Sequence, residues 1–152
     1  MQCLGFNYRI TDFQCALGSS QLKKLDKFIQ RRKEVAAFYD NCFSNDERFI
    51  IPKVSNEVSH SYHLYPLQIN FDSLKISKKE LFLSLRQKEI LCQVHYIPVH
   101  FQPYYQKNFG FKPGDFPVVE KFYEREISIP VFYGLNDQDL DFFSTTLKSL
   151  LI

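Results

Sequence analysis

Apolar residues recur every three or four positions from about residue 12 to residue 43 of the 152-residue chain. This spacing, with charged residues in between, predicts one long amphipathic helix. Thr11 and Gln14 have the spacing of a capping box, which indicates that the helix begins at about residue 12. Gly18 is its expected weak point, because glycine costs about 1 kcal/mol relative to alanine inside a helix. Residues 45–47 are predicted to form the loop that follows.

Three stretches have the composition of β-strands. Residues 61–70 alternate between apolar and polar side chains, and Pro66 within them favours an edge strand or a bulge. Residues 91–99 are predicted to form a second strand, and Pro98 near their end should turn the chain out of the sheet. Residues 127–129 are expected to form a short third strand.

The remaining stretches predict helices that cover this small sheet. Ser77 and Glu80 form a second capping box, which opens a helix that ends at about residue 88. Residues 118–126 look helical, and Asn136 is the expected N-cap of a final helix. Residues 103–117 are predicted to hold a short helix and an irregular loop. The order α-β-α-β-α-β-α indicates an α/β fold of the α+β kind, and without hairpin signals it leaves the strand order open.

The composition is that of one soluble globular domain, with 45% apolar and 24% charged residues. A net charge of +2 is too small to indicate nucleic-acid binding, and the basic run between Lys23 and Lys33 is interpreted as the solvated face of the first helix. Nothing approaches the roughly 18 consecutive apolar residues that a membrane span needs. The four cysteines form no CxxC pair, and residues 1–4 have no export signal, so free thiols and a cytoplasmic location are expected.

The polar triplet Asn7-Tyr8-Arg9 immediately precedes the first predicted helix. Side-chain donors at a helix N-terminus, beside free backbone N–H groups, suit an anion such as a phosphate. The alternative is a surface loop in which the asparagine takes a turn conformation and Arg9 pairs with Asp12. The residues by themselves leave both interpretations open.

A second candidate site lies at Gln93, Val94, His95 and Tyr96. On a strand, Gln93 and His95 share one face and Val94 and Tyr96 share the other. Polar side chains at the end of a strand are well placed to meet a polar ligand. The alternative is an edge strand whose polar residues face solvent.

Metal and cysteine chemistry are not favoured. A zinc ion between His63 and His95 would need four ligands, and no cysteine stands at ligand spacing beside them, so no metal site is predicted. The alternative for His63 is a strand histidine that is hydrogen-bonded at a domain boundary. Cys92 and His95 have opposite parity on the predicted strand, which places them on opposite faces and argues against a nucleophilic pair.

The segment Gly5-Phe6-Asn7-Tyr8-Arg9-Ile10-Thr11-Asp12, followed by Ala16-Leu17-Gly18 and Gln21-Leu22, resembles a loop-to-helix segment of the DegT/DnrJ/StrS sugar aminotransferases. These enzymes use pyridoxal phosphate (PLP). The run from His95 to His100 is similar to the His-Tyr-x-Pro-x-His pattern of the same family. Residues 59–65 and 114–136 resemble two further segments of it, so the resemblance covers essentially the whole chain.

The resemblance implies the C-terminal domain of a fold-type I PLP aminotransferase, with residues 1–45 as the end of the large domain and residues 46–152 as the small domain. It implies that Asn7, with Arg9 beside it, contacts the cofactor phosphate held by the other subunit of a homodimer. It also implies that residues 93–96 contact a nucleotide-sugar. Members acting on UDP-linked 4-keto sugars in pseudaminic acid synthesis are most similar in Gln93-Val94-His95-Tyr96. The implied reaction transfers an amino group from glutamate to C4 of a UDP-linked 4-keto-6-deoxy sugar.

The lysine that such an enzyme needs to bind PLP is not found in this sequence. The family places it upstream of the Asn7 loop, in a segment rich in Ser, Phe and His. Lys23, Lys24, Lys27 and Lys33 instead belong to a polar helix face. No catalytic residue is therefore assigned, and the chain alone is expected neither to hold PLP covalently nor to transaminate.

Two other functions stay open. The chain could be a non-catalytic module, derived from such an enzyme, that binds a nucleotide-sugar or docks on a full-length subunit. A gene upstream that encodes the lysine-bearing half would favour the enzyme, and a free-standing gene would favour the module. Nucleic-acid binding through residues 23–33 is the weakest hypothesis, because the net charge is close to neutral.

Overall fold

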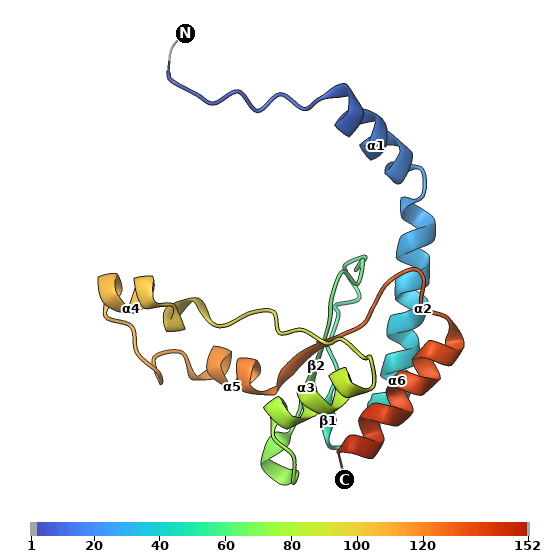
Figure 1. Ribbon diagram of the computed structural model, residues 1–152, viewed down its shortest axis with the longest axis vertical. Helices are drawn as coiled ribbons and strands as arrows, with labels where there is room; N and C mark the ends of the chain where they lie inside the picture. The colour runs from blue at the N-terminus through green and yellow to red at the C-terminus, as the bar shows by residue number, and fades with distance from the viewer. Residues whose placement is uncertain (1–2, 152) are drawn as a thin grey trace.

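The core of the protein forms where the second half of helix α2 packs, together with helix α6, on a small antiparallel sheet (Figure 1). The computed structural model describes residues 3–151. The three strands lie in the order β1-β2-β3, and both neighbouring pairs are antiparallel. The elements are α1 (Asp12–Leu22), α2 (Leu25–Phe43), β1 (Phe49–Ile50), β2 (Tyr65–Ile69), η1 (Phe71–Ser73), α3 (Lys78–Gln87), η2 (Val99–Phe101), α4 (Pro103–Phe109), α5 (Pro117–Arg125), β3 (Glu126–Ile129) and α6 (Asp137–Leu150).

Aromatic rings join the two core helices to the sheet. The side chains of Tyr65, Leu67 and Ile69 on β2 are fully buried, as the alternation of this strand predicts. The ring of Tyr39 from α2 lies edge-on to Tyr65, at 5.3 Å between centroids, and edge-on to Phe143 of α6, at 5.6 Å. Burial raises the pKa of both tyrosines. Some of the 16 phenylalanines and 9 tyrosines of the sequence are therefore part of the core packing.

The helix starts are confirmed. The side chains of Thr11, Ser77 and Asn136 each accept the N–H group three residues later and complete a capping box. The prediction of a single long helix is wrong in one detail. The helix is divided at residues 23–24, whereas Gly18, the expected weak point, lies inside α1. At the division Lys24 N–H donates to Gln21 O, at 2.9 Å. This bond spans three residues instead of four, so the turn is tighter than an α-helical one.

The prediction of a strand at residues 91–99 is wrong. Only Gln93 pairs with the sheet, in a single bridge to Ser128 of β3. The sequence analysis also missed β1. Pro66 lies on the central strand and not on an edge strand. It pairs with Ser128 of β3 on one side, and on the other side β1 pairs only with Gln68 and Ile69. Its missing N–H therefore removes no bond to β1.

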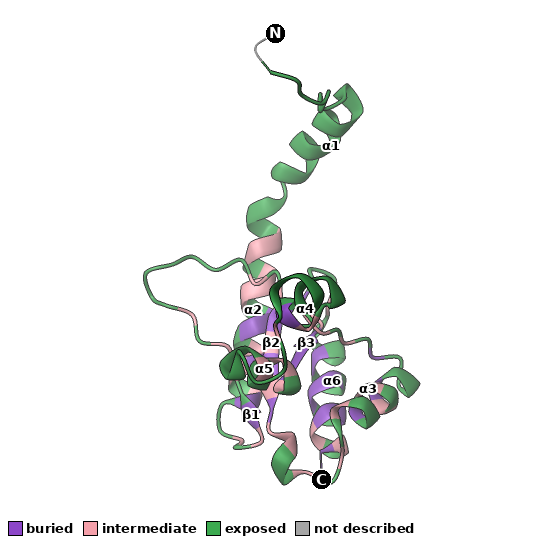
Figure 2. Cartoon of the chain, turned by 90° about the vertical axis from the view of Figure 1, so that its left-hand side faces the viewer, coloured by how far each residue is buried: buried purple, intermediate pink, exposed green. Residues whose placement is uncertain are grey.

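The beginning of the described chain stands apart from this core (Figure 2). Every residue from 3 to 27 is exposed, and α1 contributes no buried side chain. Below it in Figure 1, α4 and α5 project from the body towards the left. None of the helices among residues 3–151 has both the length and the apolar character to cross a membrane.

Candidate functional site

The Asn7 loop has an internal brace. Asn7 Oδ1 accepts the backbone N–H of Arg9, at 3.4 Å, and the Nε–H of its guanidinium, at 3.2 Å. The alternative pairing of Arg9 with Asp12 does not occur. These two hydrogen bonds engage the carboxamide oxygen of Asn7. Its NH2 group donates to none of residues 3–151. A donor set of this kind, one amide NH2 and the outer N–H groups of one guanidinium, suits a phosphate oxygen.

The helix N-terminus itself is less available for an anion than the sequence suggested. Thr11 Oγ1 accepts Gln14 N–H, at 3.4 Å, and Gln14 Oε1 accepts Thr11 N–H, at 2.9 Å. The capping box therefore satisfies two of the N–H groups that an anion could have bound. The other polar side chains of this loop that could bind an anion are those of Asn7 and Arg9.

The second candidate site is a hollow of about 300 Å³ at the edge of β3. Gln93 and His95 both line it, together with His63 and Ser128. Val94 and Tyr96 do not line it, and the Tyr96 side chain is 76% exposed. The structure therefore brings together two of the four predicted residues. The predicted sharing of one face by Gln93 and His95 agrees with this, although the segment is not a regular strand.

A buried carboxylate holds the backbone of this site. Glu126 is fully buried, and its Oε2 accepts the backbone N–H of His95, at 3.2 Å. Its Oε1 accepts the hydroxyl of Ser128, at 2.5 Å. His95 Nδ1 is buried and has no partner among residues 3–151. The sequence analysis missed Glu126 and Ser128, although their alternation in Glu-Ile-Ser-Ile places two polar side chains on one face of a buried strand.

The charge of Glu126 acts on two neighbouring side chains, those of Cys92 and Lys78. Burial, and then the charge of Glu126, raises the pKa of the Cys92 thiol to about 12, which keeps it neutral and unreactive near pH 7. The pKa of Lys78 is lowered by burial, against the charges of Glu126 and Glu124. Its ammonium donates to Tyr123 O, at 2.5 Å, so Lys78 ties α3 to α5. Lys78 therefore has a structural contact of its own.

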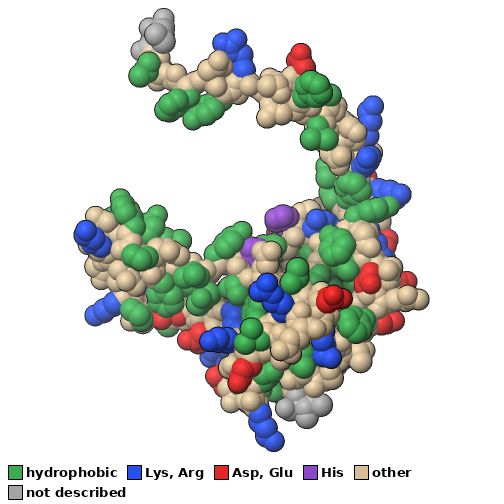
Figure 3. Space-filling view, in the orientation of Figure 1, with side chains coloured by type: hydrophobic (Ala, Val, Ile, Leu, Met, Phe, Trp, Pro, Cys, Tyr) green, Lys and Arg blue, Asp and Glu red, His purple; other side chains and the backbone are tan. Residues whose placement is uncertain are grey.

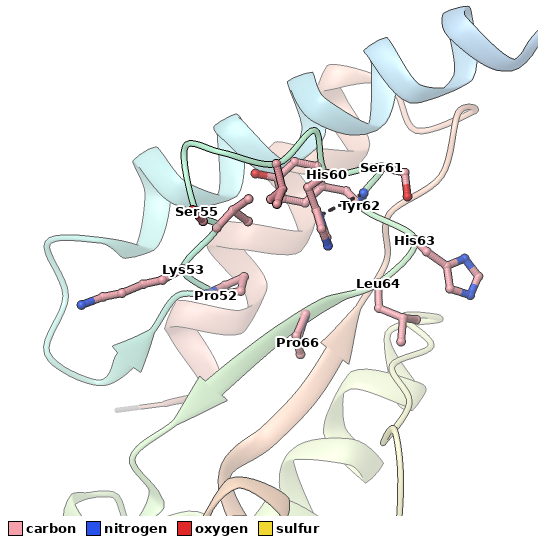
Figure 4. A pocket seen from close by; sticks show the side chains of 11 residues that line it. Pro52, Lys53, Ser55, His60, Ser61, Tyr62, His63, Leu64 and Pro66 are labelled. Carbon is pink, nitrogen blue, oxygen red and sulfur yellow. Dashed lines mark hydrogen bonds between the residues drawn. The ribbon is translucent and has the colours of Figure 1, made fainter.

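The histidines before β2 have different surroundings. His60 Nδ1 accepts Tyr62 N–H, at 3.2 Å, beside a pocket of about 420 Å³ between this loop and Pro66 (Figure 4). The His63 side chain points away from His60 in the same view. Arg32 of α2 donates to Tyr62 O and His63 O, at 2.9 and 3.1 Å, and fixes this loop. Arg32 thus binds the chain itself, which the solvated-face interpretation did not foresee.

Metal ligands do not gather at either site. His63 and His95 line the same hollow. Within residues 3–151, however, no three His, Cys, Asp or Glu side chains are arranged to hold a metal ion.

The second histidine of the His-Tyr-x-Pro-x-His pattern has a different contact. His100 is buried, and its Nε2 lies 3.0 Å from Glu120 Oε1. Glu120 also accepts the N–H groups of Gly114 and Phe116, at 2.9 and 3.2 Å. Burial alone would raise the pKa of Glu120, but these N–H groups and His100 together lower it. Glu120 therefore fastens the loop at residues 110–116 to α5, and His100 of η2 contacts Glu120 and does not line the hollow.

The two candidate sites lie apart from each other. Asn7 and Arg9 belong to the exposed arm before α1, and residues 93–96 lie beside β3 in the body (Figure 1). Each carries binding groups, and neither holds an activated nucleophile.

Comparison with known proteins identifies the family. The model of the DegT/DnrJ/EryC1/StrS aminotransferase family matches residues 1–148. The chain belongs to this aminotransferase family.

Named relatives and solved structures in the family agree. The UDP-4-amino-4,6-dideoxy-N-acetyl-beta-L-altrosamine transaminase of Campylobacter jejuni is 40% identical over 148 residues, 97% of this chain and 39% of that protein. The structure of Helicobacter pylori PseC, an aminotransferase of pseudaminic acid biosynthesis, superposes with a TM-score of 0.86 at 32% identity, over 99% of this chain and 40% of that one. The PLP form of the putative sugar aminotransferase Spr1654 of Streptococcus pneumoniae gives a TM-score of 0.84 at 30% identity, over 93% and 36%.

These TM-scores confirm the predicted fold, in which helices cover a small sheet as in the aminotransferases. The same comparisons show how much of the related proteins this chain covers. The chain spans 39% of the length of the Campylobacter transaminase and 40% of the PseC chain.

Proposed function

We propose that this chain is the C-terminal part of a PLP-dependent nucleotide-sugar aminotransferase. The whole enzyme transfers an amino group from glutamate to C4 of a UDP-linked 4-keto-6-deoxy sugar. The observation that carries the proposal is the 40% identity, over 97% of this chain, to a transaminase named for a UDP-linked 4-amino sugar. A relative of known structure in its PLP form supports the cofactor.

Asn7 and Arg9 are the residues that would hold PLP. PLP, when bound, supplies the group that carries the amino nitrogen and withdraws electrons from the substrate carbon. In this chain the Asn7 NH2 group donates to a phosphate oxygen, and the Arg9 brace on Asn7 Oδ1 keeps that NH2 group turned outward. The donor set fits the phosphate of PLP, and the lysines considered above do not fit the rest of the cofactor.

Gln93 and His95 would bind the nucleotide-sugar. Both line the hollow beside β3, so the Gln93 amide and the His95 imidazole can offer donors and acceptors to a polar ligand. Val94 and the exposed Tyr96 complete the proposed segment from outside the hollow. In a homodimer the Asn7 arm would reach the cofactor of the other subunit.

The proposal divides the chain between two domains. Residues 1–45 end the large domain, and residues 46–152 form the small domain. The second half of α2, which is buried against β2 and α6, joins the two. The cytoplasmic location expected from the free thiols stays a prediction.

The absence of a cofactor lysine is tested directly. The purified chain is incubated with PLP and reduced with borohydride, and its peptides are analysed by mass spectrometry. We expect no specific lysine adduct and no amino transfer. A single lysine that is modified at stoichiometric yield contradicts the proposal that this chain supplies only binding residues.

The role of Asn7 is tested by complementation. The chain is mixed with a polypeptide that carries the rest of the Campylobacter transaminase, and amino transfer from glutamate is measured. We expect activity that falls about a hundredfold in Asn7→Leu, since a charge-assisted contact to phosphate is lost. Asn56→Leu, at an exposed asparagine of the loop at residues 51–64, is the matched control. Equal activity of the two variants contradicts the assigned role of Asn7.

A second candidate function is a docking module. Large apolar side chains of residues 3–27 are exposed in a row, among them Leu4, Phe6 and Phe13, at 93, 84 and 90% (Figure 3). Such a surface requires a protein partner. If the gene stands alone and the chain binds a full-length subunit without activating it, the docking function replaces the catalytic one.

Nucleic-acid binding through residues 23–33 is not proposed. Salt-sensitive retention on heparin is not expected, because the guanidinium groups of Arg31 and Arg32 are bonded within the chain.

A further inference from the structure

The segment of the proposed sugar site pairs with β3 in only one place. Gln93 N–H donates to Ser128 O, at 3.1 Å, and Ser128 N–H donates to Gln93 O, at 2.7 Å. In this antiparallel register the next such pair would be His95 with Glu126. In a regular ladder, residues 93–95 would therefore form a strand beside β3, and His95 would be part of the sheet.

That second pair does not form, and the N–H group of Glu126, which would donate to His95 O, has another partner. This N–H group donates to Phe122 O and closes the last turn of α5. His95 N–H donates instead to the Glu126 carboxylate, through Oε2, at 3.2 Å. A side-chain oxygen thus takes the place of a backbone carbonyl, and the segment leaves the sheet at His95.

The carboxylate that replaces the carbonyl is fixed in turn. Glu126 is fully buried, and Ser128 is 5% exposed. The Ser128 hydroxyl donates to Oε1, at 2.5 Å, so each oxygen of the carboxylate has a partner. Burying a carboxylate is costly, and an apolar side chain would pack here without that cost. The contact with His95 is what an apolar side chain could not provide.

We propose that Glu126 is a positioning residue for the sugar-nucleotide site, acting through the His95 backbone with the help of Ser128. Its carboxylate holds the His95 backbone at the point where the segment leaves the sheet, and so keeps Gln93 and His95 in one hollow with His63. The inference rests on the proposed function, in which residues 93–96 contact the nucleotide-sugar.

The experiment compares two variants of Glu126 in the full chain. Glu126→Gln keeps an oxygen acceptor for His95 N–H, whereas Glu126→Leu keeps the volume and removes the acceptor. Glu124→Leu, at an exposed glutamate two residues earlier, is the matched control. Two properties are measured for each: the His95 amide by ¹⁵N NMR, with its hydrogen exchange, and the dissociation constant for UDP-N-acetylglucosamine as the probe.

We expect the His95 amide of Glu126→Leu to shift and to exchange about tenfold faster, since its hydrogen bond is lost. Binding of the probe should weaken about tenfold for the same reason. Glu126→Gln should restore both properties to near the wild-type values, and Glu124→Leu should change neither. A purely structural role predicts lower stability with the same His95 amide and the same affinity, and this result overturns the inference.

The two hypotheses fail in different ways. If the wild-type chain does not bind the probe, the sugar site of the proposed function fails, while the His95 amide still decides whether Glu126 positions this segment. If Glu126→Leu does not fold, Ser128→Ala and Ser128→Thr replace it. Loss of the hydroxyl should then shift the His95 amide, and threonine should restore it. An unchanged amide in Ser128→Ala overturns the inference.

Discussion

Residues 3–27 and the body at residues 28–151 contain similar apolar side chains with opposite surroundings. In the body, Val35, Tyr39 and Leu67 are fully buried, while every residue of the arm is exposed. Residues 3–27, the N-terminal arm, nevertheless contain a helix, α1, with a complete capping box. The difference teaches that local signals are sufficient to define α1, whereas its apolar side chains are suited to a partner outside the described chain.

The reactivity of the cysteines should show the largest contrast between the two regions. Cys15 of α1 is exposed, whereas the pKa of Cys92 rises from 9.0 to about 12. Because only the thiolate reacts, that rise lowers the reactive fraction about a thousandfold near pH 8. Iodoacetamide labelling followed by mass spectrometry should modify Cys15 long before Cys92. In denaturant the two rates should converge, and equal rates in the folded protein would refute the comparison.

Truncation of leucine should affect stability in the body and not in the arm. Leu67 is fully buried and Leu17 is 63% exposed. We expect Leu67→Ala to lower the free energy of unfolding by about 3 kcal/mol, through lost burial and a cavity. Leu17→Ala should change it by less than about 0.5 kcal/mol. Urea unfolding followed by circular dichroism measures both. A comparable loss in Leu17→Ala would mean that α1 packs on the body in solution.

Removal of a helix cap sharpens the comparison at a smaller scale. Ser77 caps α3 and Thr11 caps α1 by the same pair of hydrogen bonds. Ser77→Ala should lower the free energy of unfolding by about 1 kcal/mol, since α3 contributes Leu81 and Leu85 to the core. Thr11→Ala should reduce only the helicity of α1. Equal losses of global stability would show that the arm unfolds together with the body.

The smallest effect is expected in acid, at the loop held by Glu120. The folded protein lowers the pKa of Glu120 below its ordinary 4.5. A lowered pKa adds stability above the unfolded value, and that stability is lost as the pH falls through the folded value. Glu120→Gln should therefore be less stable than the wild type at neutral pH and equal to it below the folded pKa. Asp12→Asn in the arm is the control, and a pH-independent difference for Glu120→Gln would contradict this origin.

The helix starts and the position of the Asn7-Tyr8-Arg9 loop before α1 could be predicted because their determinants are local. Thr11, Ser77 and Asn136 bond groups three residues away, so the printed sequence contains both partners of each bond. Asn7 and Arg9 are two residues apart and bond each other. Their assignment to a cofactor phosphate came from the family resemblance, and it stays a proposal.

The strand at residues 91–99 failed for the opposite reason. Its alternation was real, and Gln93 and His95 do line one hollow. Continuation of the ladder needed the N–H group of Glu126, which is 31 residues after His95 and closes α5 instead. No pattern within residues 91–99 carries that information.

The sequence by itself thus determined the family, the helix starts and the alternation of β2, since each follows from neighbouring residues. Only the tertiary structure decided that β2 is the central strand, that the segment leaves the sheet at His95, and that Glu126 holds His95. These outcomes depend on which distant backbone groups are already bonded when two segments meet. A backbone N–H group that closes a helix cannot also extend a sheet.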